Sequence, residues 1–147
     1  MERVILHSDM NCFYASVEMM LNPSLRDKAV AVCGATEDRH GIVLAKSELA
    51  KKAGVKTGMV NWEAQRVCPN LILVPPHYDY YLKFSKLLHG IYKRYTDQVE
   101  PFGMDECWLD VTGTQMCSLP FRVVITVSIY DHLNFFNKKP IAKAKNV

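Results

Sequence analysis

The chain has 147 residues, of which 49% are hydrophobic and 22% charged, a composition typical of a soluble globular protein rather than a disordered one. Its net charge of +3 permits contact with a polyanion without requiring it, and no apolar run approaches the roughly 20 residues of a membrane helix. The early apolar stretch is interrupted by Asp9, so it does not have the pattern of a signal peptide, and five cysteines without Cys-x-x-Cys spacing favour reduced thiols in the cytoplasm.

The first part of the chain predicts a strand, a helix and a second strand. Residues 3–8 are apolar and β-branched at their start, which is typical of a buried strand. Asn11 can cap a helix that runs to Leu21, and the Asn-Pro pair at 22–23 stops it, because the residue before a proline disfavours helical backbone. Residues 29–33 are predicted to form the second buried strand.

The middle of the chain predicts short elements separated by turn residues. A glycine is expected to end one of the helices, because glycine adopts the left-handed conformation at little cost. In order, the elements are a polar loop at 35–40, a strand at 42–45, a helix at 47–53 ended by Gly54, a helix capped by Asn61 that ends before Pro69, and a strand at 71–74.

Residues 78–95 give the clearest helix prediction. Apolar residues recur there at alternating spacings of three and four, so they share one face. This stripe, for which core packing is the expected role, consists of Tyr81, Phe84, Leu88, Ile91 and Tyr95.

A β-hairpin is predicted after this helix. Residues 98–102 and 106–111 read as its two strands, and Gly103 begins the turn between them. Helices and strands alternate without a regular βαβ order, so the sequence favours an α+β fold.

Two acidic clusters in apolar segments are the best candidates for a functional site. Asp9 follows the first predicted strand, and Asp105 and Glu106 follow the glycine turn of the hairpin. A carboxylate among apolar residues is costly to desolvate unless it is paired or metal-bound, and three that converge would repel one another without a cation. The Met10 carbonyl could add a further hard oxygen ligand. Strict alternation along a strand would place the side chains of Asp105 and Glu106 on opposite faces of the sheet. Both reach one site only if the turn rotates Asp105 out of this alternation. The alternative is that the two carboxylates belong to a solvated turn without a catalytic role.

Several motifs, in the same order along the chain, resemble the Y-family DNA polymerases in their DNA polymerase IV branch. The resemblance covers residues 3–114. The segment His-Ser-Asp-Met-Asn-Cys-Phe-Tyr-Ala-Ser-Val-Glu at 7–18 resembles the first motif of the family, and Val-Glu-Pro-Phe-Gly-Met-Asp-Glu at 99–106 resembles its catalytic motif. The others lie at 22–25, 29–34, 54–59 and 68–71.

This resemblance implies a metal-dependent nucleotidyl transfer. It implies that Asp9, Asp105, Glu106 and the Met10 carbonyl hold two Mg²⁺ ions, with Asp105 and Glu106 as the catalytic pair. One ion would lower the pKa of a primer 3′-hydroxyl, and the other would bind the incoming deoxynucleoside triphosphate and stabilise the leaving pyrophosphate. Primer–template DNA is the implied partner.

The resemblance also implies residues that contact the nucleotide. Tyr14 would be a steric gate against a ribose 2′-hydroxyl, and Phe13 would support the sugar or the core. Ile42 and Leu44 would touch the nascent base pair. The structural alternatives are helix packing for the two aromatic residues and an ordinary buried strand for the two aliphatic ones.

The sequence departs from the family pattern in several places. Asn11 replaces a common aspartate that is not a principal ligand. Glu48 and Lys51 stand where many relatives have a tyrosine and an arginine on the triphosphate. Lys51 can still bind phosphate as a point charge, whereas Glu48 would repel it unless it turns away or pairs with a nearby lysine such as Lys52.

The C-terminal part departs furthest from the pattern. Residues 115–122 stand where the family has a longer helix, residues 123–129 resemble its next strand, and Lys139 is a candidate triphosphate lysine. The family's thumb and C-terminal DNA-gripping domain, through which a sliding clamp would also bind, have no counterpart. The expectation is a fragment or the product of a disrupted gene.

Together these inferences predict an α+β, ferredoxin-like polymerase palm with a small fingers insertion. The palm would comprise residues 1–11 and 78–147, incomplete after about 114, and the fingers residues 12–77. The parent protein would carry out error-prone, template-directed DNA synthesis past lesions in the cytoplasm, with the isolated chain inactive. The rivals are a nucleotidyl-cyclase-like palm enzyme and a non-catalytic remnant that binds nucleotide or a partner.

Overall fold

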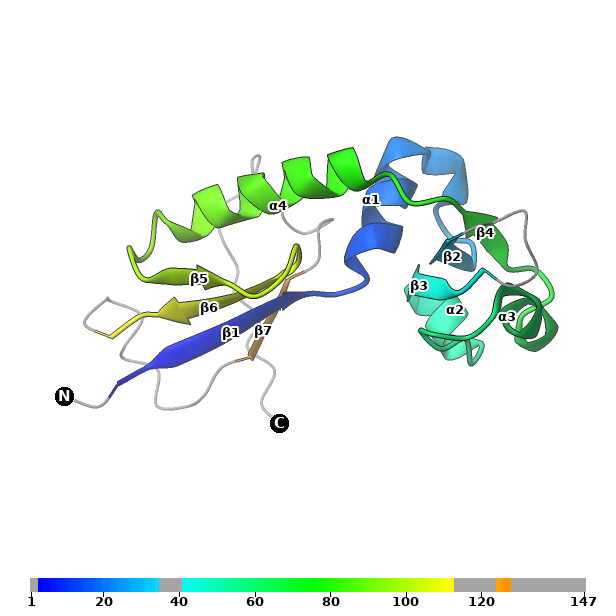
Figure 1. Cartoon of the computed structure of the whole chain (residues 1–147), viewed down its shortest axis with the longest axis horizontal. Helices are drawn as coiled ribbons and strands as arrows, with labels where there is room; N and C mark the ends of the chain where they lie inside the picture. The colour runs from blue at the N-terminus through cyan, green and yellow to red at the C-terminus, as the bar shows by residue number, and fades with distance from the viewer. Residues whose placement is uncertain (1–2, 35–40, 113–123, 128–147) are drawn as a thin grey trace. The chain divides into compact units, whose positions relative to one another are not determined.

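The computed structural model describes residues 3–34, 41–112 and 124–127 of the chain. It forms two compact units, drawn in Figure 1. The first unit contains the described parts of Met1–Asn11 and Asp79–Val147, and the second is Cys12–Tyr78. The predicted loop at 35–40, the segment 115–122 and Lys139 lie outside the described residues. No helix in the described ranges is long and apolar enough to span a membrane.

The first unit is built on a four-stranded mixed sheet with the order β5-β6-β1-β7. β1 runs antiparallel to β6 and parallel to β7, and β5 and β6 form the predicted hairpin. Helix α4 (Tyr78–Tyr92) runs along one face of this sheet (Figure 1). The strands are β1 (Ile5–Met10), β5 (Val99–Pro101), β6 (Glu106–Asp110) and β7 (Val124–Val127).

The two faces of this sheet differ because side chains alternate along β1 and β6. Leu6, Ser8 and Met10 are buried, and the residue paired with Ser8 across the strands, Cys107, is buried with them. A hydrogen bond between the hydroxyls of Ser8 and Tyr92 attaches this face to α4. The opposite face carries the alternate residues of β1, including Asp9, and is only partly buried.

Helix α4 ends earlier than the sequence predicts, at Tyr92. Its buried residues are Tyr81, Ser85, Leu88 and Tyr92. The prediction is confirmed for Tyr81 and Leu88 but wrong for Tyr95, which lies beyond the helix and is exposed. The buried stripe includes Ser85 and Tyr92, which both carry a hydroxyl group. A prediction based on the spacing of apolar residues does not select such residues.

The second unit holds a three-stranded sheet with the order β3-β2-β4. Its strands are β2 (Val30–Cys33), β3 (Val43–Lys46) and β4 (Ile72–Val74). Its helices are α1 (Phe13–Leu21), the 3₁₀ turn η1 (Pro23–Leu25), α2 (Glu48–Lys52) and α3 (Asn61–Val67). All the strands and helices predicted for this stretch are present, with ends shifted by one or two residues, which is usual for element boundaries.

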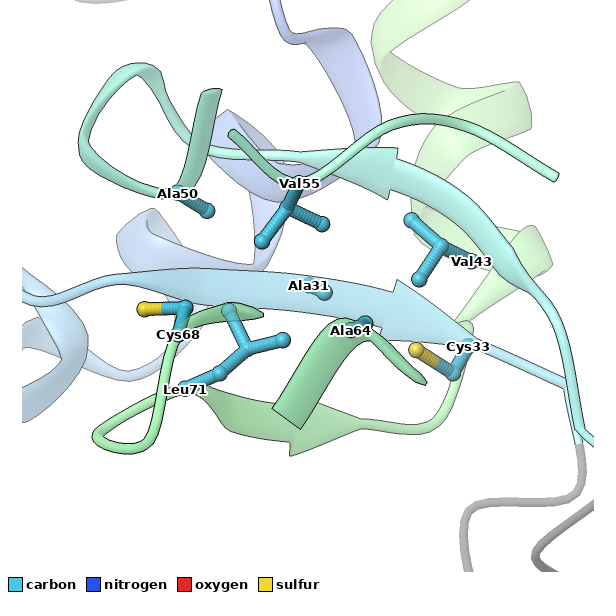
Figure 2. Packing of buried hydrophobic residues seen from close by; sticks show 8 residues of the cluster. All are labelled: Ala31, Cys33, Val43, Ala50, Val55, Ala64, Cys68 and Leu71. Atoms are coloured by element: carbon cyan, nitrogen blue, oxygen red, sulfur yellow. The ribbon is translucent and has the colours of Figure 1, made fainter. Parts of the chain in front are cut away.

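The core of the second unit forms around β2, all four residues of which are buried. Small residues on β2, α2 and α3 allow the helices to approach the sheet closely, as Figure 2 shows. Each fully buried valine or leucine contributes about 1.5–3 kcal/mol to folding. The cluster comprises Ala31, Cys33, Val43, Ala50, Val55, Ala64, Cys68 and Leu71.

Two predicted helix caps are wrong. The residue that caps α1 is Cys12, in the left-handed conformation at φ 54°, and no side-chain hydrogen bond caps this helix. Because β1 continues through Met10, the chain turns one residue later than expected, and Asn11 precedes the cap. Asn61 is the first helical residue of α3 rather than its cap, which is Val60.

The two glycines that border or interrupt helices should respond oppositely to alanine. Gly54 ends α2 at φ +97°, and an added Cβ would lie 3.3 Å from Val67 Cγ1. Gly54→Ala is therefore expected to lower the free energy of unfolding by about 1–2 kcal/mol. Gly90 lies inside α4 with no atom within 4 Å of the added Cβ, so Gly90→Ala should raise it by about 0.5–1 kcal/mol. Urea unfolding followed by circular dichroism measures both, and shifts of the same sign would contradict the prediction.

Candidate active site

Strand pairing in the first unit brings the two acidic clusters together. Asp9 lies directly opposite Glu106 in the antiparallel pairing of β1 with β6, so their side chains share the sheet face that α4 leaves uncovered. The backbone N–H of Met10 donates to the carbonyl of Asp105 at 3.1 Å. The three carboxylates thus come from neighbouring positions at one end of the sheet.

Asp105 lies in the turn rather than in the strand, because β6 begins at Glu106. The alternation that would separate the two carboxylates therefore does not apply to Asp105. Burial raises the pKa of Asp105, a hydrogen bond to its own backbone lowers it, and the negative charges of Asp9 and Glu106 raise it further. These carboxylates are thus close enough to repel one another, a repulsion that a cation would relieve.

The carboxylates of Asp9, Asp105 and Glu106 are suitable ligands for a hard divalent cation, but in this structure they do not surround one common point. Carboxylate oxygens are the ligands that Mg²⁺ prefers. Within the described residues, no three His, Cys, Asp or Glu side chains form a group that could hold a metal ion as they stand. Glu106 instead contacts His7, whose Nε2 lies 3.2 Å from its Oε2.

His7 is the residue of this site that the sequence analysis missed. It lies on the same strand face as Asp9, two residues earlier, and its ring stacks on Trp108 at a centroid distance of 4.2 Å. The signal was available in the sequence: alternation along the first predicted strand places both side chains on one face. Only the pairing of β1 with β6 shows that this face also carries Glu106.

Phe13 and Tyr14 occupy the first turn of α1 in the second unit, with ring centroids 5.5 Å apart. Phe13 is 2% exposed, which favours a packing role for its ring. Tyr14 is only partly buried and meets Tyr78 edge-on at 6.3 Å. Of the two predicted sugar contacts, Tyr14 is the one with accessible surface.

Ile42 and Leu44 flank the buried Val43 at the start of β3, so both project from its other side. Ile42 forms an isolated bridge with Val60 and is 46% exposed. The alternative of an ordinary buried strand is therefore wrong for Ile42, which presents an apolar surface to the exterior.

Lys51 lies on α2 beside Glu48, whose Oε1 is 3.7 Å from the lysine Nζ. The Cys12 thiol also donates to Glu48, at 3.3 Å. Burial, followed by the hydrogen bond and charge of Glu48, raises the pKa of Cys12 to about 11. An exposed ion pair of this kind contributes at most about 1 kcal/mol, so it does not prevent Lys51 from binding an anion.

Comparison with known proteins identifies the family. The profile of the impB/mucB/samB family matches residues 8–135. The chain belongs to this family. This confirms the resemblance to Y-family polymerases on which the sequence interpretation depends.

Two relatives of this Y-family chain are DNA polymerase IV from Acetivibrio thermocellus and DNA polymerase IV 1 from Bacillus subtilis. The first is 62% identical over 116 residues, which are 79% of this chain and 29% of that protein. The second is 49% identical over 116 residues, 79% of this chain and 28% of that protein. The chain thus spans less than a third of the length of these relatives.

A solved insertion ternary complex of Dbh DNA polymerase also resembles the Y-family chain, with a TM-score of 0.68 and 34% sequence identity. The match covers 76% of this chain and 33% of that one. A post-insertion binary complex of the same polymerase matches with a TM-score of 0.69. The predicted α+β class is confirmed, because the fold mixes helices and strands as the Y-family palm does. Y-family polymerases in general depend on a divalent metal.

Proposed function

We propose that this chain is the N-terminal catalytic part of an error-prone, template-directed DNA polymerase that synthesises past lesions. The observation that carries the proposal is the pairing of Asp9 with Glu106 beside Asp105, at one end of a sheet in a chain of this family. The first unit would be the palm and the second unit the fingers. Primer–template DNA and deoxynucleoside triphosphates would be its substrates.

In this proposal Asp9, Asp105, Glu106 and the Met10 carbonyl hold two Mg²⁺ ions. Bound there, the ions would activate the primer hydroxyl and neutralise the charge that develops on the triphosphate. The protein contributes by fixing Asp9 and Glu106 on paired strands and Asp105 in the adjoining turn. Asp105 and Glu106 are the proposed catalytic pair, and their positions beside β1 support this assignment.

The second unit would select the nucleotide. Tyr14 is proposed to exclude the ribose 2′-hydroxyl, and Ile42 and Leu44 to contact the base pair through apolar surface alone. Such contacts discriminate weakly, which suits a polymerase that accepts damaged templates. Lys51, and Lys139 from outside the described residues, would bind triphosphate. Phe13 supports Tyr14 from the core.

We also propose a location and a further partner. A polymerase of this kind meets the chromosome in the bacterial cytoplasm, where reduced cysteines are expected. The four described cysteines are free thiols, which agrees with this location. A sliding clamp is the further partner that we propose for the full-length relatives, through parts of their length that this chain does not match.

A chimera tests the proposed activity. We expect residues 3–112 of this chain to support primer extension when they replace the aligned segment of DNA polymerase IV from Acetivibrio thermocellus. The chain by itself should extend a labelled primer barely or not at all, even with Mg²⁺ at low salt. Duplex binding depends steeply on the number of phosphate contacts, and a net charge of +3 offers few.

The control is the unaltered relative, assayed beside the chimera and the chain. A chimera that folds and binds DNA but extends no primer would contradict the proposal. Formation of a cyclic nucleotide from ATP or GTP would support the cyclase-like alternative. Nucleotide binding by the chain, combined with an inactive chimera, would support the non-catalytic alternative. Robust synthesis by the chain alone would show that it grips DNA without the rest of the relatives' length.

A further inference from the structure

The sheet face of the first unit that α4 leaves uncovered carries a histidine that contacts a proposed metal ligand. His7 Nε2 lies 3.2 Å from Glu106 Oε2, between side chains that are 29% and 35% exposed. An ionised carboxylate can only accept a hydrogen bond, so Nε2 carries the proton and donates it. The contact joins residues 99 positions apart in the chain, and it forms only because β1 pairs with β6.

A second contact fixes the imidazole ring. His7 lies directly opposite Trp108 in the strand pairing, and the two rings stack with centroids 4.2 Å apart and an interplanar angle of 26°. Trp108 is 40% exposed, so the stacked pair lies on the accessible face of the sheet. Stacking limits rotation of the imidazole, and the direction of its Nε2–H is therefore set before any ligand arrives.

The hydrogen bond leaves Glu106 suited to bind a cation. One carboxylate oxygen, Oε2, accepts the hydrogen bond from His7, and the other oxygen is left to ligate a cation on the face that also carries Asp9. Carboxylates that ligate metals are commonly oriented by such outer hydrogen bonds. Loss of the outer partner typically costs 10–100-fold in metal affinity.

We propose that His7 is a positioning residue that orients the Glu106 carboxylate for divalent metal. Stacking on Trp108 fixes the orientation of the imidazole, and the imidazole donates a hydrogen bond to Glu106 Oε2. This role rests on the proposed function, because it requires that Glu106 is a metal ligand. His7 itself binds neither the metal nor the nucleotide.

Direct metal binding by the 147-residue chain tests the proposal without any assay of synthesis. The probe is Mn²⁺, titrated into the chain while free Mn²⁺ is measured by electron paramagnetic resonance. The main variant is His7→Phe, which keeps an aromatic ring over Trp108 but removes the donor. His7→Gln is its counterpart, because the amide N–H can still donate to the carboxylate. Circular dichroism verifies the fold of each variant.

We expect His7→Phe to weaken Mn²⁺ binding about 10-fold and His7→Gln to stay within about 3-fold of the unaltered chain. Asp105→Ala, which removes a proposed ligand, should weaken binding at least as much as His7→Phe. In ¹⁵N NMR spectra without metal, the His7 ring should show a protonated Nε2 whose resonance shifts in Glu106→Gln. A merely structural role for His7 would leave Mn²⁺ affinity unchanged in the folded variants.

Each remaining outcome overturns a specific statement. Unchanged affinity in His7→Phe beside weakened binding in Asp105→Ala overturns the role of His7 and leaves the proposed metal site intact. Tighter binding in His7→Phe would mean that His7 holds Glu106 away from the metal, which also overturns the positioning role. No saturable Mn²⁺ binding by the unaltered chain overturns the proposed metal site itself, together with the role that depends on it.

Discussion

Asp105→Ala in the chimera is expected to reduce the rate of primer extension about 1,000-fold, which corresponds to roughly 4 kcal/mol of lost transition-state stabilisation. The carboxylate is partly buried, and its pKa is raised by burial and by the charges of Asp9 and Glu106. These features fit a group whose negative charge is compensated by a cation rather than by water. Single-turnover extension of a labelled primer measures the effect.

The matched control is Asp110→Ala, at the end of β6 far from Asp105. Asp110 shares the sheet face of Glu106 but lies opposite Ile5 and pairs with Arg3 at 2.8 Å. Removing this carboxylate should leave the extension rate within about 3-fold, because surface ion pairs contribute little. Equal losses in the two variants would mean that the Asp105 effect reflects folding or general charge rather than metal binding.

Tyr14→Ala in the chimera is expected to lower discrimination against ribonucleotides about 100-fold, while most deoxyribonucleotide incorporation is retained. Tyr14 lies in the first turn of α1 and keeps accessible surface, whereas its neighbour Phe13 is buried. A ring at this position would exclude a 2′-hydroxyl by its bulk. The measurement is the ratio of kcat/KM for matched deoxyribonucleotide and ribonucleotide triphosphates.

Tyr14→Phe separates bulk from hydrogen bonding. The phenylalanine ring fills nearly the same volume, so this variant should discriminate almost as well as the unaltered chimera. Unaltered discrimination in Tyr14→Ala would assign Tyr14 to packing, for which its edge-on contact with Tyr78 is a physical basis. Loss of discrimination in both variants would indicate that the hydroxyl, not the ring, selects the sugar.

Local patterns were sufficient for most elements of the fold. The apolar run before Asp9, the hairpin around Gly103 and the helix from Tyr78 were all predictable, because strand and helix periods are properties of neighbouring residues. Helix caps were less predictable. Asn11 has a favourable capping side chain, but β1 extends through Met10 and leaves Cys12 to make the turn.

The composition and motifs of the sequence by itself determined the family, the α+β class and the identity of the acidic residues. Tertiary structure alone decided which of these acidic residues face each other. It also decided that Glu106 contacts His7, and that the three carboxylates of the described residues do not already surround one metal position. It likewise decided that Ser85 and Tyr92, not Tyr95, complete the buried side of α4. The physical reason is the range of the interactions: periodicity and turn chemistry act over a few residues, whereas strand register and the partners of a side chain depend on segments far apart in the chain.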